Sequence, residues 1–152
     1  MKKIIPLIVC LMLTLSACRP NPEGIEATMR EIVSAHTLSV IVNNQGYTLR
    51  LMGLDVKKEE DTQIITDIKN FLTNNGEKSL PSVKVIVASD LGKKDRFGRI
   101  SGYVWCQQGF LNQFLLQRGR ALVNLDYTDG KYDQQLLDAQ TYARVMKIGI
   151  WQ

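Results

Sequence analysis

The sequence contains little histidine and cysteine, and this scarcity excludes several kinds of site. It has one histidine, His36, and three cysteines. Cys10 and Cys18 lie in or directly after an N-terminal apolar run, so only Cys106 belongs to the remaining chain. A single thiol cannot form an intramolecular disulfide bond. A catalytic cysteine at position 106 would need His36 as its base. The apolar residues before Cys106 instead predict a buried, inert thiol.

The net charge of the chain is also small. The formal net charge is +4, from 19 Lys and Arg against 15 Asp and Glu. Residues 1–17 carry two of the lysines and no acidic residue, so the chain without them has a charge of +2. Net charge alone therefore gives no argument for a nucleic-acid partner, and such an argument needs local clustering of cations.

The N-terminal segment has the pattern of a secretory signal peptide. Lys2 and Lys3 precede the apolar run "IIPLIVCLMLTL", and the segment ends in "LSAC" at Cys18. A cysteine after two small residues resembles the lipobox of bacterial lipoproteins. That resemblance implies cleavage after residue 17, a lipid on Cys18, and a position in the cell envelope, facing the periplasm or the exterior. Residues 18–26 would then be the lipidated cysteine and a short tether. An ordinary signal peptide is the alternative.

Residues 27–152 predict one small domain of strands and helices, since the 152-residue chain is long enough for a single core. Alternating and β-branched runs predict two strands within 27–42 and further strands at 47–54, 82–89 and 100–106, with a turn at 43–46. Helical spacing predicts helices over 59–76, 112–119 and 131–149, with Asn112 as the cap of the second. Five short strands with interleaved helices fit an α+β fold built on a small OB-fold barrel.

Three segments in order resemble the staphylococcal nuclease (thermonuclease) family. They are "TLRLMGLD", "DRFGRISGYVW" and "ARVMKIGIW", which begin at Thr48, Asp95 and Ala143. The segment "FLNQFLLQRGRALV" is also similar to the family sequence before its last helix. The resemblance covers about residues 27–151. It implies a five-stranded OB-fold barrel with three helices.

The resemblance also implies a chemistry. Active relatives cleave DNA and RNA with calcium, using two carboxylates for the ion, a glutamate that assists the attacking water, and two arginines on the phosphate. The arginines match Arg50 and Arg99, and one metal carboxylate matches Asp55. Guanidinium groups suit the charge and geometry of a phosphate. The alternatives are an ion pair between Arg50 and Asp55 and a merely exposed Arg99.

Further candidate contacts to nucleic acid surround Arg99 in the segment "KKDRFGR". Lys93, Lys94 and Arg96 would attract a phosphate backbone. Phe97 offers a ring face to a base or ribose, and Tyr127 is a second aromatic candidate. Such a charge run is otherwise typical of a solvated loop, with Phe97 covering the barrel edge.

The metal half of the matched site departs from the family pattern. The family has two aspartates where this chain has Ser34 and His36. A neutral imidazole is a poor calcium ligand. Lys58 stands at the position of the helper glutamate, and an ammonium group cannot accept a proton from water at neutral pH. Asp55 is left as the one matched metal ligand. The prediction is therefore no cofactor, or weakly bound calcium.

Two substitutes for the lost groups stay open. Glu59 lies one residue after the matched position, and a one-residue slip of the loop would bring it into the site. His36 together with Asp55 would otherwise hold a softer metal such as zinc, or His36 would act as a base.

The sequence therefore predicts a lipid-anchored, thermonuclease-like domain. Its partners would be a membrane, through the lipid, and nucleic acid or another polyanion, bound without efficient calcium-dependent cleavage. One alternative is an active phosphodiesterase or endonuclease with an altered metal site. The other is an envelope protein–protein interaction module that uses the barrel as a scaffold.

Overall fold

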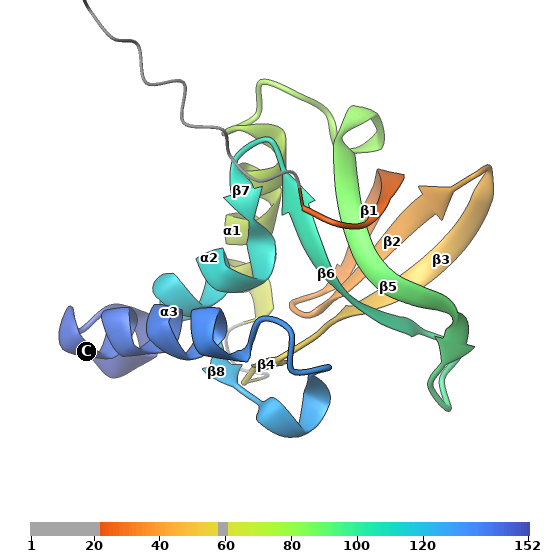
Figure 1. Cartoon of the computed structure of the whole chain (residues 1–152). Coiled ribbons are helices and arrows are strands. Elements are labelled where there is room, and N and C mark those ends of the chain that lie inside the picture. Colours follow the sequence, from red (N-terminus) through yellow and green to blue (C-terminus); the bar gives the residue numbers. More distant parts are fainter. Residues whose placement is uncertain (1–21, 58–60) are drawn as a thin grey trace, which may run out of the picture.

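The computed structural model describes residues 22–57 and 61–152 (Figure 1). The predicted signal peptide, Cys18, Lys58 and Glu59 lie outside the described residues. The main strands are β1 (Ile25–Ser34), β2 (Thr37–Val42), β3 (Gln45–Leu51), β5 (Lys84–Lys94) and β6 (Ile100–Cys106). Shorter strands are β4 (Leu54–Asp55), β7 (Gly109–Phe110) and β8 (Leu122–Val123). The helices are α1 (Asp61–Thr73), α2 (Leu111–Gln117) and α3 (Asp133–Val145), with 3-10 turns at Leu80–Ser82, Leu125–Tyr127 and Gly149–Trp151.

The five main strands form a closed barrel. Their order is β3-β2-β1-β5-β6, and neighbouring strands are antiparallel. The barrel closes where β3 pairs with β6 in parallel, with Leu49 opposite Ile100 and Leu51 opposite Gly102. Closure leaves no unpaired edge in the ring of strands. The predicted OB-fold barrel with three helices is confirmed.

Alternation along the strands and helical spacing in the helices build a single core. Leu49 and Leu51 of β3 and Val87 of β5 point into the barrel and have no exposed surface. In α1, Ile64 and Ile68 lie one turn apart and are equally buried. Figure 1 shows the three helices grouped on one side of the barrel. No helix in residues 22–57 and 61–152 is long and apolar enough to cross a membrane.

The predicted strand at 47–54 is two strands. The backbone leaves β3 at Met52 and turns at Gly53, whose φ of 72° is favourable for glycine. The Gly53 N–H donates to the Tyr127 carbonyl at 2.8 Å. β4 therefore pairs with β8 outside the barrel. The turn between β2 and β3 is shorter than the predicted turn at 43–46. It consists of Asn43 and Asn44, whose φ values are 48° and 65°.

The predicted cap at Asn112 is wrong. Asn112 lies inside α2 and is fully buried. Its Oδ1 accepts from the Val104 N–H at 3.1 Å, and its Nδ2 donates to the Met52 carbonyl at 2.9 Å. Phe110 occupies the cap position without a side-chain hydrogen bond. Asn112 therefore joins α2 to the barrel instead of starting the helix.

Two other predictions concern β5 and Cys106. β5 extends to Lys94, so Lys93 and Lys94 belong to a strand and the turn proper covers residues 95–99. Cys106 is a free thiol that is only partly buried. Burial raises the pKa of its thiol, which agrees with the predicted inert cysteine.

Candidate functional site

Neighbouring strands bring the matched arginines and His36 to one end of the barrel. Thr37 of β2 is opposite Arg50 of β3, and Arg50 is opposite Ser101 of β6. His36 directly precedes β2, and Arg99 directly precedes β6. The backbone positions of His36, Arg50 and Arg99 are therefore set by three adjacent strands, although they lie far apart in the sequence.

Arg50 packs against an aromatic ring instead of a carboxylate. Its Cζ lies 3.8 Å from the centroid of the Tyr127 ring, which is cation–π geometry. Its Nε is buried and has no hydrogen-bond partner in residues 22–57 and 61–152. Asp55 is exposed, and no ion pair joins it to Arg50. A buried N–H without a partner is unfavourable, and an anion's oxygen would satisfy it.

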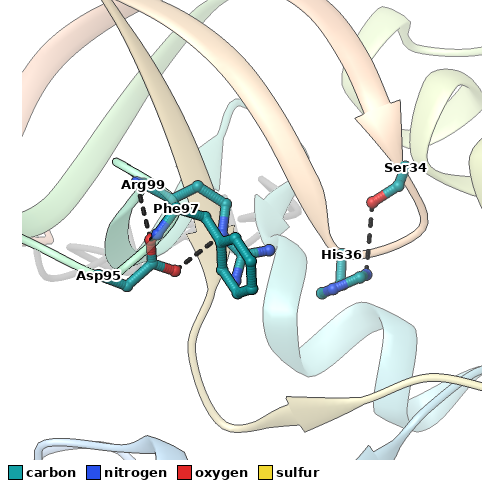
Figure 2. Close-up of polar contacts among 5 residues, drawn as sticks. All are labelled: Ser34, His36, Asp95, Phe97 and Arg99. Carbon is teal, nitrogen blue, oxygen red and sulfur yellow. Dashed lines mark hydrogen bonds and ion pairs between the residues drawn. The ribbon is translucent and has the colours of Figure 1, made fainter.

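Asp95 fixes the position of Arg99. Its Oδ2 accepts from Arg99 Nε at 2.8 Å, and its Oδ1 accepts from the backbone N–H groups of Phe97 and Arg99, each at 2.9 Å (Figure 2). Burial raises the pKa of Asp95, but the hydrogen bonds from Arg99 and Phe97 outweigh it and hold the pKa below its ordinary value. No carboxylate in the described part of the chain pairs with the terminal N–H groups of Arg99.

Phe97 presents an exposed ring beside two cations. The residue is 65% exposed, which does not fit the alternative of an aromatic that covers the barrel edge. The Cζ atoms of Arg96 and Arg99 lie 4.7 Å and 5.1 Å from its ring centroid. The turn is closed by Gly98, with a φ of 75°. The segment therefore exposes an aromatic ring with two guanidinium groups lying over it.

A cavity of about 270 Å³ opens between β5, β6 and the turn at Leu125–Tyr127. Three of the predicted residues line it: Lys93, Lys94 and Tyr127. The remaining lining residues are Met52, Asp90, Asp95, Ser101, Asp126 and Thr128.

The carboxylates of this cavity were not predicted as site residues. Asp126 adjoins Tyr127, and Asp90 lies on β5, but no spacing in the sequence places the two segments together. The cavity mixes lysines with carboxylates, so it is less cationic than the turn at residues 95–99.

The metal half of the site does not fit calcium in the described residues. Ser34 Oγ and His36 Nδ1, which the sequence predicts to replace the family's two aspartates, lie 3.3 Å apart (Figure 2). Within residues 22–57 and 61–152, no three His, Cys, Asp or Glu side chains are grouped to hold a metal ion. Calcium takes about six to eight oxygen ligands. Asp55 alone does not supply such a set.

Comparison with known sequences decides the family. The profile described as "Staphylococcal nuclease homologue" matches residues 48–152. The chain belongs to the staphylococcal nuclease family. A thermonuclease of Staphylococcus hyicus is 26% identical over 123 residues, covering 79% of this chain and 72% of the relative. A thermonuclease of Staphylococcus intermedius is 24% identical over 127 residues, covering 82% and 74%.

Membership of this family makes the barrel end with Arg50 and Arg99 the natural place to look for activity. The family match covers both arginines, Asp55 and the turn at residues 95–99. It leaves the function of each single side chain as a prediction.

Proposed function

We propose that this protein is a lipid-anchored member of the nuclease family that binds nucleic acid, or a similar polyanion, without efficient calcium-dependent cleavage. The supporting observation is that one end of the barrel has groups suited to phosphate binding but no group of metal-binding carboxylates among the described residues. Arg50, Arg99 and the Phe97 turn provide cations and an aromatic face, while the described carboxylates form no metal group.

Phosphate binding would use the two guanidinium groups differently. Arg50 is held by the Tyr127 ring, and its Nε is buried without a hydrogen-bond partner among the described residues. Arg99 is held by Asp95 through its Nε and has its terminal N–H groups available. Both are ordered by the fold before a ligand binds, so less side-chain entropy is lost on binding.

Phe97 would stack on a base while Arg96 and Lys94 attract the backbone. Stacking on an aromatic face does not require one particular base, and the attraction of cations for phosphates does not read sequence. The expected ligand is therefore a single strand, bound with little sequence preference and with strong salt dependence.

Binding is tested with a fluorescent single-stranded DNA and the full chain in a mild detergent. Arg96→Ala should lower the slope of log K against log salt by about 0.7, the value expected for one lost phosphate contact. Arg30→Ala is the matched control, because Arg30 is an exposed arginine on β1 and lines neither of the cavities. Equal slopes for the two variants would contradict a phosphate-binding role for the turn.

Stacking is tested by Phe97→Ala, which should weaken binding roughly tenfold by removing a base contact. Tyr142→Ala on α3 is the control, since Tyr142 is also an exposed aromatic, at 51%. If both variants bind DNA as the parent chain does, Phe97 is not a stacking platform.

A second candidate function is an active phosphodiesterase, and the family match favours it. The same preparation is incubated with DNA with and without calcium. Metal-dependent cleavage that disappears in Arg99→Ala would overturn the proposal that cleavage is inefficient. If neither cleavage nor salt-sensitive binding occurs, the protein-interaction alternative remains.

The mapping of the metal half has its own test. His36→Asp with Lys58→Glu restores two carboxylates of the family pattern, and calcium affinity should rise because calcium prefers carboxylate oxygens. Isothermal titration calorimetry measures the affinity. No gain in a variant that remains folded by circular dichroism would show that residues 36 and 58 do not face the same site.

The lipid anchor is a proposal based on the N-terminal sequence. The mature protein should partition with membranes, and Cys18→Ala should release it or leave an uncleaved precursor. Mass spectrometry of the mature N-terminus would detect the added acyl chains. An unmodified N-terminus at another residue would indicate an ordinary signal peptide.

A further inference from the structure

A second cavity, of about 320 Å³, lies among α1, α2 and the turn between β6 and β7. It shares no lining residue with the first cavity and contains none of the predicted nuclease residues. Its carboxamide side chains come from Asn70, Asn74, Asn75 and Gln108, and we call it the amide pocket.

The polar groups of the amide pocket are mainly neutral donors and acceptors. Each carboxamide has two N–H donors and one acceptor oxygen. Asn74 donates to Glu77, and Gln108 Oε1 accepts from Cys106 Sγ. The side chains of Asn70 and Asn75 have no hydrogen-bond partner within the described residues. A ligand rich in hydroxyl groups, which both donate and accept, would match them.

The charges of the amide pocket do not favour a polyanion. Asp67 is 7% exposed, and its Oδ2 accepts from Arg120 Nε at 2.6 Å. Its Oδ1 accepts from Gln63 Nε2 at 3.3 Å. Arg118 is exposed and brings one positive charge to the lining. The first cavity carries Lys93 and Lys94 together with Asp90, Asp95 and Asp126. The described lining of the amide pocket therefore contains no cluster of cations that would hold a polyanion.

An apolar wall accompanies the carboxamides. Phe71 of α1 and Phe114 of α2 stack with centroids 4.1 Å apart and an interplanar angle of 22°. Both line the pocket and are partly exposed. A pyranose ring has a C–H face that packs on an aromatic ring, while its hydroxyl groups point outward to polar side chains.

The turn after α1 sets the backbone positions of two of the carboxamides. Asn74, Asn75 and Gly76 have φ values of 53°, 56° and 93°. The Asn75 N–H donates to the Asn70 carbonyl at 2.8 Å, and the Gly76 N–H donates to Thr73 Oγ1 at 3.0 Å. Asparagine adopts the left-handed conformation more readily than most residues, and the turn after α1 thereby holds the backbone of Asn74 and Asn75 beside the pocket.

We propose that the amide pocket binds a neutral pyranose sugar. The exposed part of the Phe71 and Phe114 pair packs against C–H groups of the sugar, and Asn70 and Asn75 hydrogen-bond the hydroxyl groups or an N-acetyl amide. This ligand is distinct from the polyanion of the proposed function. The protein would thereby contact a glycan through one side and a charged strand through the end of the barrel.

The test uses the 15N-labelled full chain in a detergent without a sugar headgroup. Chitotriose and maltotriose are titrated separately, to distinguish N-acetylated from unsubstituted sugars. The amide resonances of residues 70–76 and 107–109 should shift saturably, and Arg99→Ala should not change the affinity. No saturable shift at roughly 10 mM of either trisaccharide would overturn the proposal.

Variants assign the binding to the carboxamides. Asn70→Ala should weaken binding about fivefold, and because alanine favours helix it should not unfold α1. Asn75→Gly should have a similar effect, since glycine adopts positive φ without strain. Asn44→Gly is the matched control, because Asn44 is also an exposed asparagine with positive φ, in the β2–β3 turn.

Two further results would contradict the assignment. The first is a sugar affinity that is unchanged in both Asn70→Ala and Asn75→Gly. The second is a sulfated trisaccharide that shifts the same resonances more strongly than both neutral sugars, because the ligand class would then be anionic.

Discussion

Single side chains set much of the geometry around the basic turn. Asp95 is the acidic residue of the turn, and it accepts three hydrogen bonds that set the positions of Phe97 and Arg99. Arg50 is similarly defined by the Tyr127 ring. The sequence predicted the two arginines from their motifs, but the groups that orient them became visible only in the fold.

Asp95→Asn should destabilise the protein by roughly 1 kcal/mol at neutral pH, because a charged acceptor becomes neutral. The folded pKa of Asp95 is lowered, so its charged form stabilises the fold above the unfolded pKa of about 3.9. That contribution is lost as the pH falls through the folded pKa. The difference between the parent and variant free energies of unfolding should therefore shrink below about pH 4.

Urea denaturation across the acidic range measures this difference. Asp126→Asn is the control, since Asp126 lines the same cavity and its carboxylate accepts no hydrogen bond within residues 22–57 and 61–152. A constant parent–variant difference for Asp95→Asn between neutral and acidic pH would contradict the role assigned to the carboxylate.

The strands and helices show where sequence periodicity succeeds and where it fails. Alternation located the barrel strands, and helical spacing located α1 and α3 to within a few residues. The short helix α2 was located correctly, but its Asn112 was assigned to a cap. Asparagine is a common cap residue, and no local pattern shows that this one is buried against Val104 and Met52.

Asn112→Ala should lower the free energy of unfolding by about 1 to 3 kcal/mol for each backbone group that it leaves buried without a partner. The Val104 N–H and the Met52 carbonyl are these groups. Gln113→Ala is the neighbouring control, because Gln113 accepts only from Gln135 in an exposed contact. Chemical denaturation should show a change of less than about 0.5 kcal/mol for the control.

The molecule as a whole is closed by contacts between distant segments. The parallel pairing of β3 with β6 completes the barrel. Near the C-terminus, the Ile150 N–H donates to the Gly119 carbonyl at 3.0 Å. This hydrogen bond holds the C-terminal segment against the end of α2. A Cβ atom at Gly119 would overlap the Ile148 carbonyl, so the two segments approach as closely as glycine allows.

Gly119→Ala should therefore destabilise the protein more than Gly130→Ala. Both glycines have positive φ, at 60° and 83°, and each alanine costs about 1 kcal/mol of backbone strain. Only Gly119 also has backbone atoms in the way of a Cβ, whereas nothing lies within 4 Å at Gly130. Thermal unfolding compares the two. Equal losses of stability in the two variants would show that the C-terminal segment can move away from residue 119 without a loss of folding free energy.

The sequence by itself determined the order of strands and helices, the family, and the positions of Arg50 and Arg99. It did so because periodicity records which side of each segment is buried, and because the family motifs have a fixed order and spacing. Only the tertiary structure decided that Tyr127 supports Arg50, that carboxylates share the first cavity, and that four carboxamides line the second. These groups meet because barrel closure and helix packing bring distant segments together, and no local pattern encodes which distant segments will touch.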